Sequence, residues 1–340
     1  MAERGVPAEE VRSVLIVNVS RIGDTLLATP AMRAIARAFP GAAITCLAHP
    51  KRAEILENLP FITHLGRIEK RAALLRGRLR RKRFDLGFVY GFDEALVAYA
   101  LRAATRVVAF RQRSETLNQR LAAAVPAPPP QSMHAVHLAL RLCDALQIPH
   151  AGFRLAYAVS ANEHAWAADR LRALGLARHT PLIGLQVASF PTKRYRDWPV
   201  ESFAALARRI LAARPDAHFL IFGGPEERQR TAWLAAALGA AATRFAGALS
   251  LRQTAAVMSL THLYVGVDTG PTHIMGCFDI PLVALYHCNS PSRIYGALEH
   301  PNFYALDHPG RDPCPENPPM SEISVDRVLA TVDRALGAGA

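Results

Sequence analysis

Several features that identify common classes of protein are absent from this chain of 340 residues. The opening stretch, MAERGVPAEEVRS, is polar and holds none of the apolar core that a secretory signal needs, so we expect no signal peptide. No run of about 18 or more apolar residues occurs, so we expect no bilayer-spanning helix. The five cysteines form no C-x-x-C pair, which favours reduced thiols and a cytoplasmic location. They are Cys46, Cys143, Cys277, Cys288 and Cys314.

Motifs that mark nucleotide and metal chemistry are also scarce. No G-x-G-x-x-G follows a predicted strand and no G-x-x-x-x-G-K-[ST] occurs, which disfavours the dinucleotide fingerprint and P-loop chemistry. One group of potential metal ligands comprises His273, Cys277, His287 and Cys288. Their spacing matches no standard zinc pattern, and core positions on a helix and a strand explain the cysteines, so we expect no metal site.

Basic residues are in excess. The chain has forty Lys and Arg and twenty-eight Asp and Glu, which gives a formal net charge of +12. This excess favours an anionic partner but does not indicate which kind. Residues 66–84, GRIEKRAALLRGRLRRKRF, carry nine basic residues and one Glu. This segment could be a solvated basic helix, or it could bind an anionic membrane surface at roughly 1 kcal/mol per basic residue. No aromatic residues interleave with its charges, so we expect no nucleic-acid partner.

Apolar runs of strand length alternate with helical stretches rich in Ala, Leu and Arg, a pattern typical of βαβ units and a parallel sheet. The predicted strands are Val14–Val19, Ala43–Leu47, Leu86–Tyr90, Arg106–Phe110, Leu182–Val187, His218–Phe222, Leu263–Val267 and Pro281–Tyr286. The predicted helices include Met133–Gln147, Ala161–Leu174, Glu201–Ala213 and Leu251–Leu260, the last with Ser250 as N-cap. Because the pattern runs twice, we expect an α/β protein with two doubly wound, Rossmann-like domains, residues 1–160 and 161–340, facing a cleft.

Polar residues follow the predicted strands of the second half. After Leu263–Val267 comes "DTGPTH", in which we expect Pro271 at the first helical position. Ligands of open α/β sheets bind at the carboxyl ends of strands, and a helix N-terminus there favours an anion. Three loops of this domain could therefore converge on one nucleotide, or they could be ordinary corners and solvated loops. The residues concerned are Ser189, Thr192, Lys193, Gly223, Gly224, Glu227, Asp268, Thr269, Gly270 and His273.

The first half has one comparable position. Gly23 and Asp24 follow the first predicted strand, so Asp24 stands at the carboxyl edge of the N-terminal sheet. Thr29 and Pro30 could cap a helix that follows a loop, or Pro30 could kink a helix that begins near Asp24. Asp24 could be a helix cap, or it could take a proton from a hydroxyl that approaches within about 3 Å.

These stretches together resemble the bacterial heptosyltransferases of glycosyltransferase family nine. The similar segments are "VLIVNVSRIGDTLLATPAMRAI", "FPTKRYRDWPVESF", "FGGPEER" and "VDTGPTHIMGCFDIPLVALY", which come in the family's order between about residues 13 and 300. The resemblance implies a GT-B fold with the acceptor site in the first domain and the nucleotide-sugar site in the second. It implies inverting, metal-independent transfer from ADP-heptose to the lipopolysaccharide inner core, with no cofactor, by a cytoplasmic protein that could be peripheral on the inner membrane.

By position, the resemblance makes Asp24 the general base and places Gly23 and Arg21 at the acceptor. Lys193 then contacts the donor phosphate and Glu227 contacts the ribose. Thr269, Gly270 and His273 bind the diphosphate region, and Asp268 belongs to the same site. The chain departs from the family's pattern at Gln186 and in the inserted "RYRD". Two alternatives remain open: transfer of another nucleotide-activated sugar, or binding of a nucleotide sugar without transfer.

Overall fold

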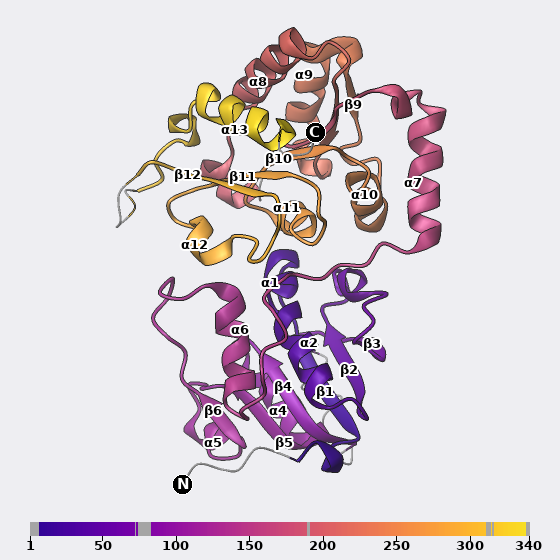
Figure 1. The fold of residues 1–340 in the computed structure, drawn as a ribbon. Coiled ribbons are helices and arrows are strands. Elements are labelled where there is room, and N and C mark those ends of the chain that lie inside the picture. Colours follow the sequence, from indigo (N-terminus) through magenta and orange to yellow (C-terminus); the bar gives the residue numbers. More distant parts are fainter. Residues whose placement is uncertain are drawn as a thin grey trace. The chain divides into compact units, whose positions relative to one another are not determined.

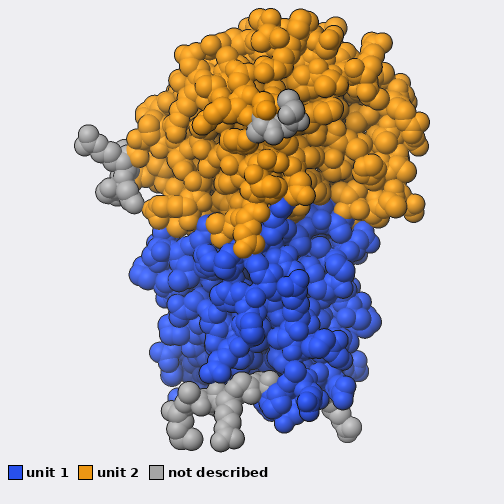
Figure 2. Space-filling view, viewed as in Figure 1, with its two compact units in different colours: residues 1–158 blue, residues 159–340 orange. Residues whose placement is uncertain are grey.

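The computed structural model describes residues 7–71, 73, 83–188, 191–310, 314 and 316–337. The chain divides into two compact units, residues 1–158 and 159–340, coloured separately in Figure 2. Each unit is built on one six-stranded sheet with helices around it (Figure 1). Among the described residues, none of the helices combines the length and the apolar character that crossing a bilayer requires.

The sheet of unit 1 is parallel throughout, in the order β3-β2-β1-β4-β5-β6. Its strands are β1 (Ser13–Asn18), β2 (Ala43–Ala48), β3 (His64–Arg67), β4 (Phe84–Tyr90), β5 (Ala104–Phe110) and β6 (Ala123–Val125). Its helices include α1 (Ile22–Leu27), α2 (Thr29–Ala38), α4 (Glu94–Ala103), α5 (Glu115–Asn118) and α6 (Ala135–Asp144). The chain moves outward from β1 to β3 and then returns to place β4 beside β1, so the strand order reverses between β1 and β4.

Unit 2 repeats this topology, with the order β12-β11-β10-β7-β8-β9 and parallel pairing throughout. Its strands are β7 (Leu182–Gln186), β8 (His218–Phe222), β9 (Ala242–Arg244), β10 (Leu263–Val267), β11 (Leu282–Tyr286) and β12 (Phe303–Asp307). Its α-helices include α7 (Ala161–Ala173), α8 (Val200–Ala213), α9 (Arg228–Leu238), α10 (Leu251–Met258), α11 (Gly270–Met275), α12 (Ser292–Tyr295) and α13 (Val325–Gly337). Here the order reverses between β7 and β10.

Short 3-10 helices complete the described elements of both units. They are Ala8–Glu10, Ala53–Leu56, Leu176–Arg178, Pro191–Arg196, Pro225–Glu227, Gly239–Ala241 and Met320–Glu322. The segments Pro191–Arg196 and Pro225–Glu227 lie directly after β7 and β8, and both contribute residues to the site described below.

Helices bury both faces of the unit 2 sheet, as its continuous apolar runs predict. Alternate residues such as Ile183 and Leu185 of β7 face a core shared with α8, α9 and α13. The other set of alternate residues in these strands faces a second core, shared with α7 and α10. Leu182, Leu220 and Tyr264 belong to this core. In Figure 1, α8, α9 and α13 accordingly lie together on one face of the sheet. The α/β, doubly wound prediction is confirmed.

The eight predicted strands all occur within one or two residues of their predicted bounds. The structure adds four strands, and each is an edge strand of its sheet: β3, β6, β9 and β12. Ser250 accepts a hydrogen bond from the backbone N–H of Gln253 and caps α10, as predicted.

A glycine in β10 determines how closely α11 packs on the sheet. A Cβ on Gly266 would lie 2.7 Å from Cε1 of Tyr264 and 3.0 Å from Oγ1 of Thr272. The Thr272 hydroxyl donates to the carbonyl of Val267 at 2.6 Å, which fixes the first turn of α11 against the end of β10. The Tyr264 ring in turn occupies space beside Gly184 of β7, where a Cβ would lie 2.9 Å from the ring.

We therefore expect Gly266→Ala to destabilise the protein by about 1–3 kcal/mol, because the added methyl group meets a buried ring and a hydroxyl that is already hydrogen-bonded. Urea unfolding measures the change. Gly41→Ala is the matched control, since the nearest atom to its Cβ is 3.7 Å away, and it should change stability little. Equal unfolding midpoints for the two variants would contradict this account of the β10–α11 contact.

Candidate functional site

The point at which the strand order reverses in unit 2 gathers three loops. The 3-10 helix Pro191–Arg196 follows β7, and the turn Asp268–Thr269 leads from β10 into α11. The loop that holds Ser290 follows the neighbouring strand, β11. Open α/β sheets bind ligands at such a position, outside the carboxyl ends of the strands, so this is the candidate donor site.

The carboxylate of Asp268 joins these loops. One oxygen, Oδ2, lies 3.3 Å from Nη1 of Arg196 and accepts a hydrogen bond of 2.9 Å from the Ser290 hydroxyl. The other, Oδ1, lies 3.2 Å from Nε2 of His273, on the first turns of α11. Residues from the loop after β7, from α11 and from the loop after β11 therefore meet on one carboxyl group.

The Asp268 side chain is only 8% exposed. Its burial and its partners shift the pKa of the carboxyl group in opposite directions. Burial alone raises the pKa of a carboxyl group, since it removes water from the charged form. The partners outweigh this effect of burial, and the pKa of Asp268 is lowered. They act through the hydrogen bond and charge of His273, the charge of Arg196 and the hydrogen bond from Ser290. The group is therefore a carboxylate at neutral pH, and it holds the surrounding cation and donors in place.

A second ion pair ties the loop after β7 to the first turn of α9, the helix that follows the loop after β8. Asp197 Oδ2 lies 2.7 Å from Nη1 of Arg230 on α9, and the Asp197 side chain is only 4% exposed. Glu227 closes the turn itself, because its Oε2 accepts a hydrogen bond of 2.6 Å from the N–H of Gly224. Burial raises the pKa of Glu227. Glu227 thus has a structural role as a cap, whether or not it also contacts a ribose.

The predicted donor residues differ in how they are placed. Thr192 is exposed and Lys193 is half-buried within the 3-10 helix, where Lys193 has non-helical backbone angles of φ −131° and ψ 36°. Thr269 is the N-cap of α11 and Gly270 its first residue, so Pro271 is second and the prediction of Pro271 at the first position was wrong by one. Ser189 lies outside the described residues.

The reversal point of unit 1 carries Asp24. The loop after β1 leads into α1, with Arg21 as N-cap and Gly23 and Asp24 in the first turn. Asp24 is exposed, and α1 ends at Leu27 before α2 begins, with Ala28 between them. The start of α2 agrees with the first predicted arrangement to within one residue, since Ala28 and not Thr29 is its N-cap. The segment before it is a short separate helix that contains Asp24, where a loop was predicted.

Sequence reasoning missed two residues of this site and the pairing of two cysteines. Arg196 and Ser290 both hold Asp268. Arg196 lies in the inserted "RYRD", where no role was assigned to it, and Ser290 lies outside the segments that resemble the family. Cys288 and Cys314 form a disulfide, so the prediction of reduced thiols was wrong for this pair. The pairing was not apparent because 26 residues separate them, and only the parallel placement of β12 beside β11 brings the two strand ends together.

The basic segment 66–84 is described only in part. Its residues 72 and 74–82, which include most of its arginines, lie outside the described residues. Lys70, near its start, pairs with Asp93 at 2.8 Å on an exposed surface.

Two Rossmann-like units with this order of strands match the GT-B fold of solved heptosyltransferase structures. The chain matches the model of glycosyltransferase family 9 (heptosyltransferase) over residues 72–316. The chain belongs to this family and is a transferase, which confirms the resemblance seen in its motifs.

Individual relatives agree with this membership. The lipopolysaccharide core heptosyltransferase OpsX of Haemophilus influenzae is 22% identical over 298 residues, which cover 84% of this chain and 82% of that protein. A family 9 glycosyl transferase from Veillonella parvula has a similar fold, with a TM-score of 0.81, 18% identity and coverage of 98% and 99% of the two chains. The ADP-heptose lps heptosyltransferase II of E. coli gives a TM-score of 0.78 at 20% identity, over 96% and 99%.

We expect the Arg196–Asp268 pair to show strong energetic coupling, because both side chains are largely buried. In a double-mutant cycle of Arg196→Gln and Asp268→Asn, urea unfolding should give a coupling energy of about 1–3 kcal/mol. The more exposed pair Arg214–Asp333, joined at 2.8 Å in the same unit, is the control and should couple by less than about 0.5 kcal/mol. A coupling energy no larger than the control value would show that Asp268 does not depend on Arg196.

Proposed function

We propose that this protein transfers a heptose from ADP-heptose to the inner core of lipopolysaccharide, with inversion at the anomeric carbon and without a metal ion on the diphosphate. The observation that carries the proposal is the cluster of loops joined at Asp268, at the ligand-binding edge of unit 2 in a family 9 chain. The names of its relatives agree with this substrate pair. OpsX acts on the lipopolysaccharide core, and E. coli heptosyltransferase WaaC has a solved structure with ADP.

The donor site supplies positive charge where the leaving group becomes more negative. As the bond to the sugar breaks, ADP gains charge on its diphosphate, and fixed donors can stabilise that charge. The backbone N–H groups at the start of α11 have no partners within that helix and point out of its N-terminus. Thr269 and Gly270 stand at that start, and Lys193 comes from the neighbouring loop. These groups take the place of a catalytic cation.

The acceptor hydroxyl needs a base as it attacks the anomeric carbon. Asp24 fits this role because it is an exposed carboxylate at the reversal point of unit 1, directly after β1. In this proposal Arg21 and Gly23, next to Asp24 in the same segment, contact the acceptor. Unit 1 is thus the acceptor-binding domain and unit 2 the donor-binding domain in this proposal.

The direct test is a transfer assay with ADP-heptose and a short, delipidated inner-core acceptor. Heptose transfer is expected, with UDP-sugars and GDP-sugars inactive, and NMR of the product gives its anomeric configuration. Asp24→Ala should lower the rate by about 10²–10⁴-fold while ADP affinity, measured by calorimetry, stays unchanged, since the residue acts on the acceptor hydroxyl. A variant that retains more than about a tenth of the wild-type rate would remove Asp24 from the role of base.

Lys193→Ala should weaken ADP binding by roughly 1.5–3 kcal/mol, the usual value of a hydrogen bond to a charged group. Calorimetric titration with ADP measures the loss. The neighbouring Arg194 is exposed, so Arg194→Ala is the matched control and should bind ADP like the wild type. If instead Arg194→Ala loses the affinity and Lys193→Ala keeps it, the insertion "RYRD" has exchanged the two roles.

The acceptor is a lipid, and the basic segment 66–84 is suited to meet its membrane. On this view the protein is cytoplasmic and binds the inner-membrane surface peripherally through charge. It should sediment with anionic liposomes at low salt and be released at high salt, because the Debye length falls from about 10 Å at 0.1 M to about 3 Å at 1 M. The variant Arg80→Gln/Arg81→Gln/Lys82→Gln/Arg83→Gln should lose liposome binding but keep its activity on the delipidated acceptor. If the wild-type protein does not bind these liposomes at low salt, the proposal is wrong and the segment is only a solvated basic surface.

A further inference from the structure

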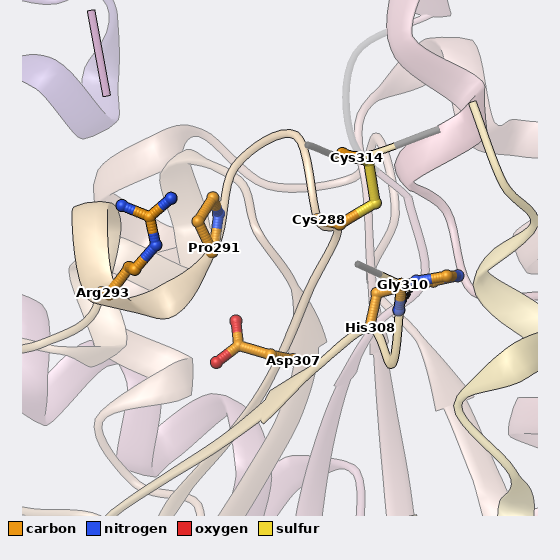
Figure 3. A pocket seen from close by; sticks show the side chains of 7 residues that line it. All are labelled: Cys288, Pro291, Arg293, Asp307, His308, Gly310 and Cys314. Atoms are coloured by element: carbon orange, nitrogen blue, oxygen red, sulfur yellow. Dashed lines mark hydrogen bonds between the residues drawn. A yellow bond between two sulfur atoms is a disulfide. The ribbon is translucent and has the colours of Figure 1, made fainter. Parts of the chain in front are cut away.

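A second cluster of reactive side chains lies in unit 2, at the ends of β11 and β12. His287 and Cys288 directly follow β11, and His308 directly follows β12. Figure 3 shows the pocket at this place, with the bonded sulfur atoms of Cys288 and Cys314 beside His308 and Gly310. None of these side chains has a part in the proposed transfer.

The potential ligand atoms of this cluster are close together. One ring nitrogen of His287 and the two sulfur atoms of Cys288 and Cys314 all lie within 4.8 Å of one another. Ligands of a tetrahedral zinc ion, each about 2.0–2.3 Å from the metal, are separated by roughly 3.5–4 Å. A small movement of side chains is therefore enough to place these three atoms around one ion.

His287 and His308 are both oriented so that Nδ1 is the nitrogen that can bind a metal. Nε2 of His287 lies 3.0 Å from the carbonyl of Pro318, and Nε2 of His308 lies 3.2 Å from the carbonyl of Pro319. A carbonyl only accepts, so each Nε2 carries the hydrogen and each Nδ1 keeps its lone pair. Histidines that bind metals are commonly oriented in this way, by donating the other N–H to a backbone carbonyl.

The two Nδ1 atoms face the sulfur atoms. Nδ1 of His287 lies 3.9 Å from Sγ of Cys288. A Cβ on Gly310 would lie 2.8 Å from Nδ1 of His308 and 3.3 Å from the same sulfur, so only a glycine leaves this space open. In the structure, backbone N–H groups of Asn289 and Gly310 donate to the two Nδ1 atoms at 3.1 Å and 2.8 Å, and metal binding would replace these two hydrogen bonds.

We propose that Cys288 and Cys314, in their dithiol form, bind one transition-metal ion of the zinc class together with Nδ1 of His287 and of His308. Two thiolates and two imidazoles form a Cys2His2 set, which suits Zn²⁺ or iron and does not suit Mg²⁺ or Ca²⁺. The structure has the oxidised form of the pair, in which the sulfurs are bonded to each other. A thiol reductant supplies two electrons and two protons to that bond and is itself oxidised to a disulfide, and the metal then displaces both thiol protons.

The site would fasten the loop that supports Asp268. Ser290, which donates to Asp268, is two residues after Cys288 in the same loop. Metal ligation would tie this loop to the chain after β12, where Cys314 and the carbonyls of Pro318 and Pro319 lie. The role of the metal is thus structural, and its binding can be measured without any transfer assay.

The test begins with the wild-type full chain, reduced with a phosphine under nitrogen and freed of reductant. Titration with Co²⁺, a spectroscopic substitute for zinc, should saturate at one ion per chain with the visible bands of tetrahedral coordination and the ultraviolet band of thiolate ligation. Elemental analysis after exposure to Zn²⁺ and Fe²⁺ together decides which metal the site retains. Metal loading should also protect Cys288 and Cys314 from alkylation, as mapped by mass spectrometry.

Variants locate the ion. Cys288→Ser, Cys314→Ser and His308→Asn should each weaken metal binding by more than about 100-fold, because a direct ligand is lost. Cys277→Ser is the control, since that thiol donates to the carbonyl of His273 and lies outside the cluster, and it should bind like the wild type. The proposal is overturned if the reduced wild-type chain takes up no metal, or if the metal binds without protecting Cys288 and Cys314. The protection measurement needs no variant, so misfolding of a cysteine variant does not remove the test.

Discussion

The buried carboxylate of Asp268 is the group on which the candidate donor site depends. A charge with so little access to water is stable only when close partners replace the lost hydration, and here Arg196, Ser290 and His273 do so. Each partner comes from a different loop or helix. The need to satisfy one carboxylate therefore brings three segments, distant in sequence, to a common position at the sheet edge.

The surrounding packing makes that arrangement possible. Small residues in β7 and β10 admit the Tyr264 ring, and the ring and Thr272 in turn set how deeply α11 sits against the sheet. The Asp197–Arg230 pair likewise ties the loop after β7 to α9. A preorganised set of donors loses little free energy in reorienting when charge develops on a bound diphosphate, which is the physical advantage of holding such loops in place.

Much of this architecture was predictable from sequence, and what was missed has a physical pattern. The central strands are largely buried, although alternate residues of β2 are only half-buried and Thr105 and Arg106 of β5 are exposed. They appear as mainly apolar runs, and all eight were found. The edge strands β3, β6, β9 and β12 have fewer buried residues: His64 and Arg67 of β3 are exposed, and so is Arg244 of β9. For such strands, sheet pairing decides the structure more than composition does.

The position of the candidate site was also predictable, because polar residues after buried strands must gather at one edge of a parallel sheet. The partners within it were not. Arg196 stands in a run of basic residues in which nothing distinguishes it from Arg194, and its selection depends on where the 3-10 helix turns. Cys288 and Cys314 likewise meet only through the pairing of β11 with β12. Contacts between side chains on separate loops are properties of the three-dimensional fold, and sequence spacing does not encode them.

Both sheets have the same strand order, and each is completed by one uninterrupted stretch of chain. Among the described strands none is exchanged across residue 158, so the hydrogen bonds of each of these sheets begin and end on the same side of that boundary. A genetic crossover at this point between related chains would deliver an intact half to each descendant. The halves of such a protein can therefore diverge at different rates and be recombined, and a lineage can acquire a new specificity in one half while it inherits the other unchanged.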